Sequence, residues 1–105
     1  MVKYEVSLQR SPLSDKKYLA IVNGKKVHFG EKGAKDYTTH SRSERDDAKK
    51  SYLARHRGGD EKWGLNGIEK AGFWSRWILW NETTISASIR YLENKYTNLN
   101  IINHI

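Results

Sequence analysis

Cysteine is absent from this chain, proline occurs once and phenylalanine occurs twice. Without cysteine there is no disulfide and no thiolate metal site, which excludes the small secreted scaffolds that disulfides hold together. The longest apolar runs, "LAIV" and "WILW", are far shorter than the ~20 residues that cross a bilayer. The segment "MVKYEVSLQR" lacks the apolar stretch that a signal peptide contains. We therefore expect a soluble protein of a reducing compartment, or of a particle assembled there, with no membrane partner and no cofactor.

Positive charge is plentiful and unevenly placed. The net charge is +7, from nineteen Lys and Arg against twelve Asp and Glu. Residues 1–57 carry fourteen of the basic residues against seven acids, whereas residues 58–105 carry five of each. The excess therefore lies in the first half, which favours a polyanionic partner, with nucleic acid first, or an acidic protein surface. A charged face that only keeps the protein soluble stays open as the alternative.

A three-stranded antiparallel sheet is predicted at the N-terminus. "KYEVSLQ" (3–9) alternates apolar and polar residues, as a half-buried strand does. In "YLAIVNGKKVHF", Asn23-Gly24 is the favoured pair for a two-residue type I′ turn, because both positions need a positive φ. β-Branched and aromatic residues flank the turn and predict strands at 18–22 and 25–29.

Three helices are expected to cover one face of this sheet. "SRSERDDAKKSYLARHR" (41–57) has acids early, bases late and a stop at Gly58-Gly59, and its thin apolar stripe indicates a surface helix. "AGFWSRWILW" (71–80) is apolar nearly all round, as a buried helix is. In "TTISASIRYLENKY" a threonine at 83 or 84 is the expected N-cap.

The rings of residues 71–80 are interpreted mainly as core, because each buried ring removes about 150–250 Å² from water and the chain has few other core candidates. Trp74 or Trp80 is left free to reach the surface beside Arg76. The fold class is therefore α+β, with a single domain over 1–96. The segment 97–105 is assigned to a C-terminal tail, for which a short strand, a partner-binding segment and a frayed end stay open. The predicted core comprises Phe73, Trp74, Trp77, Trp80, Ile85, Ile89 and Leu92.

Three motifs, "FG…DYTTH", "YLARH" and "AGFWSRWILW", occur in this order. Over about residues 3–96 the combination resembles a family of small uncharacterised proteins that recur in large (giant) double-stranded DNA viruses of eukaryotes. The resemblance implies a viral origin and association with the virion or with DNA, and it implies no known reaction. The chain departs from the family at Glu82-Thr83, where a proline is expected before the last helix; no functional residue is affected.

The candidate nucleic-acid-binding set consists of cations on the hairpin, the loop after it and the first helix. Such a surface tracks phosphates without reading bases, and Arg76 beside aromatic edges adds stacking. Asp46 and Asp47 interrupt the helix, and no recognition helix is present, so sequence-specific binding is not expected. The set is Lys16, Lys17, Lys25, Lys26, Lys32, Lys35, Arg42, Arg45, Lys49, Arg55, Arg57 and Arg76.

Catalytic and metal-binding residues are not predicted. Convergence of Asp36, His40, Glu44 and His56 would hold a divalent ion for a hydrolytic nuclease. However, the chain has no HExxH spacing, no GxSxG turn and no phosphate loop ending in GK[ST].

We therefore hypothesise a non-catalytic protein of a large DNA virus, associated with the virion or the genome, that binds DNA nonspecifically through its basic first half. It would lie in the virion and, during assembly, in the host cytoplasm or nucleus. The alternative is a minor capsid or cement protein that binds capsid proteins through its tail and sheet edge, without nucleic-acid contact. A metal-dependent nuclease is the third reading. Homo-oligomerisation stays open.

Overall fold

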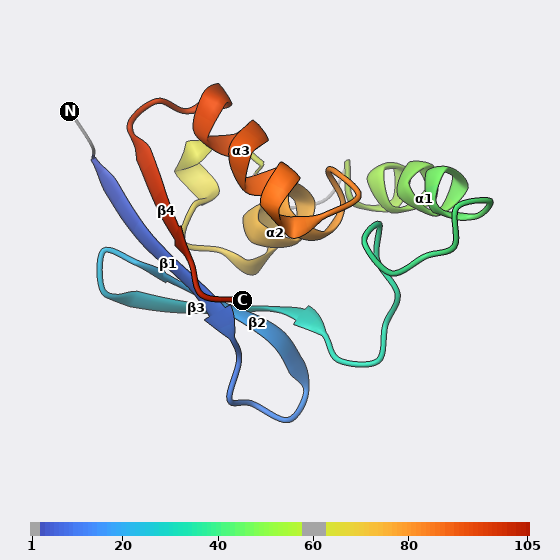
Figure 1. Cartoon of the computed structure of the whole chain (residues 1–105), viewed down its shortest axis with the longest axis horizontal. Helices are drawn as coiled ribbons and strands as arrows, with labels where there is room; N and C mark the ends of the chain where they lie inside the picture. Colours follow the sequence, from blue (N-terminus) through green and yellow to red (C-terminus); the bar gives the residue numbers. More distant parts are fainter. Residues whose placement is uncertain (1–2, 58–62) are drawn as a thin grey trace.

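The computed structural model describes residues 3–57 and 63–105 and shows an α+β architecture. The expected helix stop at Gly58-Gly59 and the beginning of the following loop lie outside the described residues. Figure 1 shows the arrangement of the strands and helices. The elements are β1 (Tyr4–Arg10), β2 (Lys16–Val22), β3 (Lys25–Glu31), α1 (Arg45–Arg57), η1 (Leu65–Gly67), α2 (Ala71–Trp74), η2 (Ser75–Leu79), α3 (Ile85–Lys95) and β4 (Leu99–Asn103).

The predicted hairpin forms at the expected turn. Asn23 and Gly24 have φ values of 48° and 90°, and β2 pairs antiparallel with β3 on either side of them. The Asn23 side chain also accepts a hydrogen bond from the Glu5 backbone N–H at 2.9 Å and donates one to the Lys3 carbonyl at 3.2 Å. The turn residue therefore both closes the hairpin and ties it to β1.

The sheet has a fourth strand, so the prediction of three antiparallel strands was only partly right. The strand order is β3-β2-β1-β4, and β4 runs parallel to β1. β4 comes from the segment 97–105 that the sequence assigned to a tail. Leu99 and Ile101 are buried, so alternate residues of β4 complete the core face of the sheet. A parallel neighbour requires a crossover connection, and α3 lies in the crossover that returns the chain to this edge.

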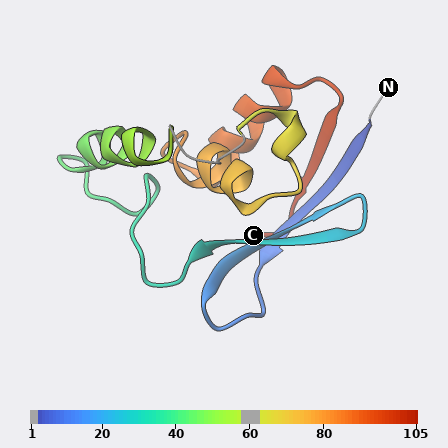
Figure 2. The same ribbon diagram turned by 180° about the vertical axis from the view of Figure 1, so that it is seen from behind.

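Helices cover one face of the sheet, and α1 stands apart from them. In Figure 1, α2 and α3 lie above the sheet, while α1 lies at the far end of the molecule after a long connection from β3. Figure 2 shows the same separation from behind. α1 meets the body through Tyr52, whose ring stacks on Trp80 with centroids 4.7 Å apart and planes 7° from parallel.

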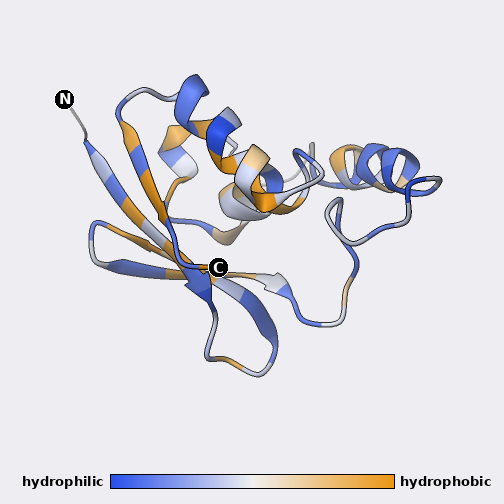
Figure 3. Ribbon diagram, in the orientation of Figure 1, coloured by the Kyte–Doolittle hydropathy of each residue, from blue (hydrophilic) through white to orange (hydrophobic). Residues whose placement is uncertain are grey.

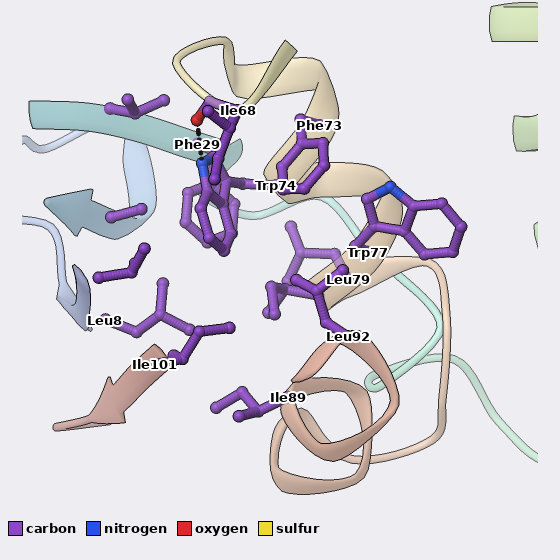
Figure 4. Close-up of a cluster of buried hydrophobic side chains, with 14 of the residues drawn as sticks. Leu8, Phe29, Ile68, Phe73, Trp74, Trp77, Leu79, Ile89, Leu92 and Ile101 are labelled. Carbon is purple, nitrogen blue, oxygen red and sulfur yellow. Dashed lines mark hydrogen bonds between the residues drawn. The ribbon is translucent and has the colours of Figure 1, made fainter. Parts of the chain in front are cut away.

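Aromatic rings fill the space between the sheet and the helices (Figure 4). Trp74 and Phe29 are completely buried, and their ring centroids lie 6.3 Å apart. The Trp74 indole N–H donates to the Ile68 carbonyl at 2.7 Å, so its polar atom is satisfied inside the core. Of the residues assigned to the core from the sequence, the buried ones are Phe73, Trp74, Trp77, Trp80, Ile89 and Leu92, and Ile85 is half-buried.

The segment 71–80 is not one regular α-helix. α2 has four residues and continues as a π-helix, η2, in which the Trp80 N–H bonds to the Ser75 carbonyl at 3.0 Å. This i→i+5 bond widens the last turn. It occurs directly before the place where Trp80 leaves the helix and meets α1.

The surface helices follow the polarity of their sequences (Figure 3). α3 has an apolar face toward the sheet and a polar face outside, and its N-cap Thr84 accepts a hydrogen bond from the Ala87 N–H at 3.1 Å. α1 is polar over most of its surface. Among the helices in the described residues, none is long and apolar enough to span a membrane.

Candidate functional site

A pocket of about 370 Å³ opens where α1 meets the body of the protein. Its walls come from the start of β2, the end of β3, the loop after β3, the last turns of α1 and the first residues of α2. Four of the lining residues are small, namely Gly30, Ala34, Ala71 and Gly72.

Four of the predicted cations meet at this pocket. Lys16 and Lys17 come from β2, Lys35 from the loop after β3, and Arg55 from α1. Two acids, Glu31 and Asp36, also line it.

Asp36 fixes the loop that forms one wall of the pocket. Its carboxylate is almost fully buried and accepts from the Lys17 ammonium at 2.6 Å and from the Thr38 N–H at 2.8 Å. The Asp36 N–H in turn donates to the Thr39 hydroxyl at 2.8 Å. The "DYTT" residues therefore form a closed hydrogen-bonded turn around one carboxylate, and the charge of Lys17 is neutralised within it.

The aromatic rings at the pocket are already engaged with one another. Tyr52 stacks on Trp80, and the His56 ring lies 4.4 Å from the Tyr52 ring. Phe29 packs between Tyr18 and Trp74 in the core. Because these rings contact one another, the pocket presents charges to a ligand rather than an open ring face for a base.

A smaller pocket of about 170 Å³ adjoins the first at Lys17. Arg10 and Lys32 line it, and both side chains are exposed. Arg10 is a cation that the sequence reasoning missed, because it precedes the proline loop and the register that places it beside β2 cannot be read locally. Together the two pockets define a surface that we call the basic face, consisting of Arg10, Lys16, Lys32, Lys35 and Arg55.

Within residues 3–57 and 63–105, none of the five cations of the basic face forms an ion pair. Lys26 and Arg42, also predicted, are exposed and likewise unpaired in these ranges, but they line neither pocket. Arg57 lies in α1, and its side chain is outside the described part.

Other predicted cations are committed to intramolecular contacts. Lys25 pairs with Glu69 at 2.8 Å on the surface, which lowers the pKa of that carboxyl. The Lys49 ammonium donates to the Asn81 carbonyl at 2.7 Å and lies 4.6 Å from the Tyr37 ring. Burial, and then the neighbouring Arg76, lower the pKa of Lys49. Such contacts leave less of each charge for an external anion.

Arg76 does not offer its guanidinium beside an exposed Trp74 or Trp80, as the sequence suggested, because both of those rings are buried. Its guanidinium donates to the Trp80 carbonyl at 2.7 Å and lies 4.4 Å from the Trp77 ring. Desolvation by burial lowers the pKa of Arg76. Arg76 therefore acts mainly as a packing residue. Arg45 also lies against a ring, with its guanidinium carbon 5.9 Å from the centroid of the Tyr37 ring.

The four residues considered for a metal site are not brought together. Asp36 is held by Lys17 and Thr38, and His40 Nδ1 is 3.8 Å from the Glu44 carboxylate. In the part of the chain that the structure describes, no three His, Asp or Glu side chains gather as a metal would require.

The fold and site thus define a small α+β domain with a cationic pocket beside its first helix. A family model described as a family of unknown function (DUF5754) matches residues 6–56, just under half of the chain. The match spans most of β1, the hairpin, the loop of Asp36 and most of α1, which together carry every cation of the basic face. No curated protein and no solved structure matches the chain.

Proposed function

We propose that this chain is a non-catalytic protein of a large DNA virus, associated with the virion or the genome, that binds DNA nonspecifically through the basic face. The observation that carries the proposal is the gathering of five cations without ion pairs in the described residues, around two adjoining pockets. Cations of this kind contact phosphates, which carry no sequence information. The viral setting, in the virion or the host cytoplasm or nucleus, rests on the resemblance of the sequence motifs.

The basic face replaces the broader set of twelve cations as the proposed contact surface. Lys17, Lys25, Lys49 and Arg76 have partners inside the protein, and Arg10 is added. The engaged rings at the larger pocket also support backbone contact over base stacking.

The proposal is tested by titrating labelled duplex DNA across a salt series. If three to five phosphates are contacted, the logarithm of the binding constant should fall against the logarithm of salt concentration with a slope of about −2.7 to −4.5. Lys32→Gln should make this slope shallower by about 0.9. Arg90→Gln is the matched control, because Arg90 is exposed on α3 and lines neither pocket. Absence of binding at low salt, or a flat line, overturns the proposal.

A minor capsid protein is the second candidate, and one surface favours it. Ile102 of the edge strand β4 is 51% exposed, and no charged residue lies between 97 and 105. Strand addition at this edge is limited, because the Leu99 N–H bonds the Tyr96 carbonyl at 3.1 Å and the Ile101 N–H bonds the Glu93 carboxylate at 2.9 Å. Stoichiometric presence in purified shells free of DNA would favour this candidate.

The non-catalytic part of the proposal has its own test. Plasmid DNA is incubated with the protein and Mg²⁺ or Mn²⁺, and no nicking is expected. Metal-dependent nicking that disappears in His40→Ala or His56→Ala would establish the nuclease instead.

A further inference from the structure

The larger pocket has the size of a small-ligand site. Its volume of about 370 Å³ lies in the range of about 300–1,000 Å³ typical of such sites. Gly30 lets β3 pack closely against two other lining residues, because a Cβ there would lie 2.9 Å from Leu79 Cδ1 and 3.2 Å from Lys17 Cβ. Because the pocket has walls on several sides, it accommodates the end of a nucleic-acid strand better than an internal position. An internal phosphate is bonded to a nucleotide on each side, and both nucleotides would have to fit with it.

The charge of the pocket exceeds that of one backbone phosphate. Lys17 and Asp36 neutralise each other at 2.6 Å. Among the described residues that line the pocket, Lys16, Lys35 and Arg55 then face a single further acid, Glu31, which is the cross-strand partner of Lys16. The remaining balance is two positive charges. An internal phosphodiester carries one negative charge, whereas a phosphomonoester carries about −1.5 to −2 at pH 7.

These cations reach the pocket from three separate elements. Lys16 belongs to β2, Lys35 to the loop after β3, and Arg55 to the last turn of α1. A group with three terminal oxygens can accept from several directions at once, as a phosphomonoester does. A diester has only two such oxygens.

We propose that the larger pocket binds a phosphomonoester, and that its source is the terminal phosphate of a nucleic-acid strand. The choice of source rests on the proposed function, whereas the preference for a monoester rests on the pocket alone. The protein would then contact backbone phosphates along the basic face and hold a phosphorylated strand end in the pocket.

The test compares oligonucleotides of one sequence that carry a terminal phosphate at the 5′ end, at the 3′ end or at neither end. Anisotropy of an internal label at fixed salt reports their dissociation constants. At least one phosphorylated form should bind about tenfold more tightly, the effect of one additional charge-assisted hydrogen bond. Adenosine monophosphate, titrated alone, distinguishes the source: binding as tight as that of the oligonucleotide assigns the site to free nucleotides.

Two variants connect the preference to the pocket. Lys35→Gln and Arg55→Gln should each abolish most of the advantage of the terminal phosphate. Lys50→Gln is the matched control, since Lys50 is exposed on the same helix as Arg55 and does not line the pocket; the advantage should persist. Circular dichroism spectra of all variants verify that they are folded.

The outcomes separate this inference from the proposed function. The inference is overturned if all three oligonucleotides bind with equal, salt-dependent affinity and adenosine monophosphate does not bind. This result leaves the proposed function standing. Binding of the monophosphate without binding of any oligonucleotide overturns the proposed function and the strand end as source, but supports the monoester site.

Discussion

Replacing Lys17 by methionine measures what burial adds to an ion pair in this protein. The Lys17 and Asp36 side chains are 15% and 3% exposed, and their charged atoms are 2.6 Å apart. Methionine keeps much of the apolar stem and removes the charge, so the Asp36 carboxylate stays buried with only its hydrogen bonds from Thr38. Removing one partner of a buried pair costs about 3–5 kcal/mol. Because Lys17 retains some exposure, we expect a loss of about 3 kcal/mol in the free energy of unfolding.

Equilibrium unfolding in urea is the assay. With an m value of about 1–3 kcal/mol per molar urea, the midpoint should fall by about 1–3 M. Lys25→Met is the control, because it removes the same charge from a pair of similar length whose side chains are 62% and 52% exposed. Its midpoint should change little, since solvent screens the exposed pair with Glu69. Equal shifts in the two variants would refute the reasoning.

A second variant covers the case in which Lys17→Met fails to fold. Adding Asp36→Asn removes the unpaired charge, and the amide oxygen still accepts from Thr38. The double variant should therefore be more stable than Lys17→Met. If the double variant is less stable than Lys17→Met, the loss of stability in Lys17→Met does not come from an unpaired buried charge.

Three further measurements test the core, the loop and the first helix. Trp74→Phe should lower the free energy of unfolding by about 2–4 kcal/mol, because it leaves a buried carbonyl without its donor and opens a cavity. Gly33 has a φ of 92° and open space around it, so Gly33→Ala should lower the free energy of unfolding in urea by about 1–2 kcal/mol. Gly30 has a φ of 78° and lies against packed side chains, so Gly30→Ala should lower it by more. The hydrogen bond to Asp46 raises the pKa of Tyr37 above 10.0. This contact therefore persists below pH 10.0 and is lost as the pH rises through the pKa of Tyr37 in the folded state. In Asp46→Asn, an NMR titration of the Tyr37 ring should show a lower pKa than in the unchanged protein.

The local features of the fold could be predicted from short stretches of sequence. Asn23-Gly24 specifies the hairpin because its backbone angles are a property of the two residues themselves. Thr84 caps α3 through a hydrogen bond to a residue three positions away. The burial of Phe73 and Trp77 was predicted from the nearly all-apolar segment 71–80, whereas the sequence left open whether Trp74 or Trp80 reaches the surface.

The fourth strand and the state of the cations could not be predicted in this way. β4 pairs with β1, from which it is separated by almost the whole length of the chain. The sequence of a short segment that mixes polar and apolar residues does not specify which strand it will pair with. Lys17, Lys32 and Lys49 look alike in sequence, yet one is paired with a carboxylate, one is exposed and one bonds a backbone carbonyl. Arg10 joins the basic face only through the sheet register.

The sequence by itself determined the α+β class, the hairpin, the aromatic core and the excess of positive charge in the first half, because backbone angles, periodicity and composition act over a few residues. Only the tertiary structure decided which cations remain available to a ligand and that three of them meet at one pocket. The reason is physical: a charge is neutralised or left free by groups within a few ångströms in space, and those groups come from β2, β3, α1 and the loop between them.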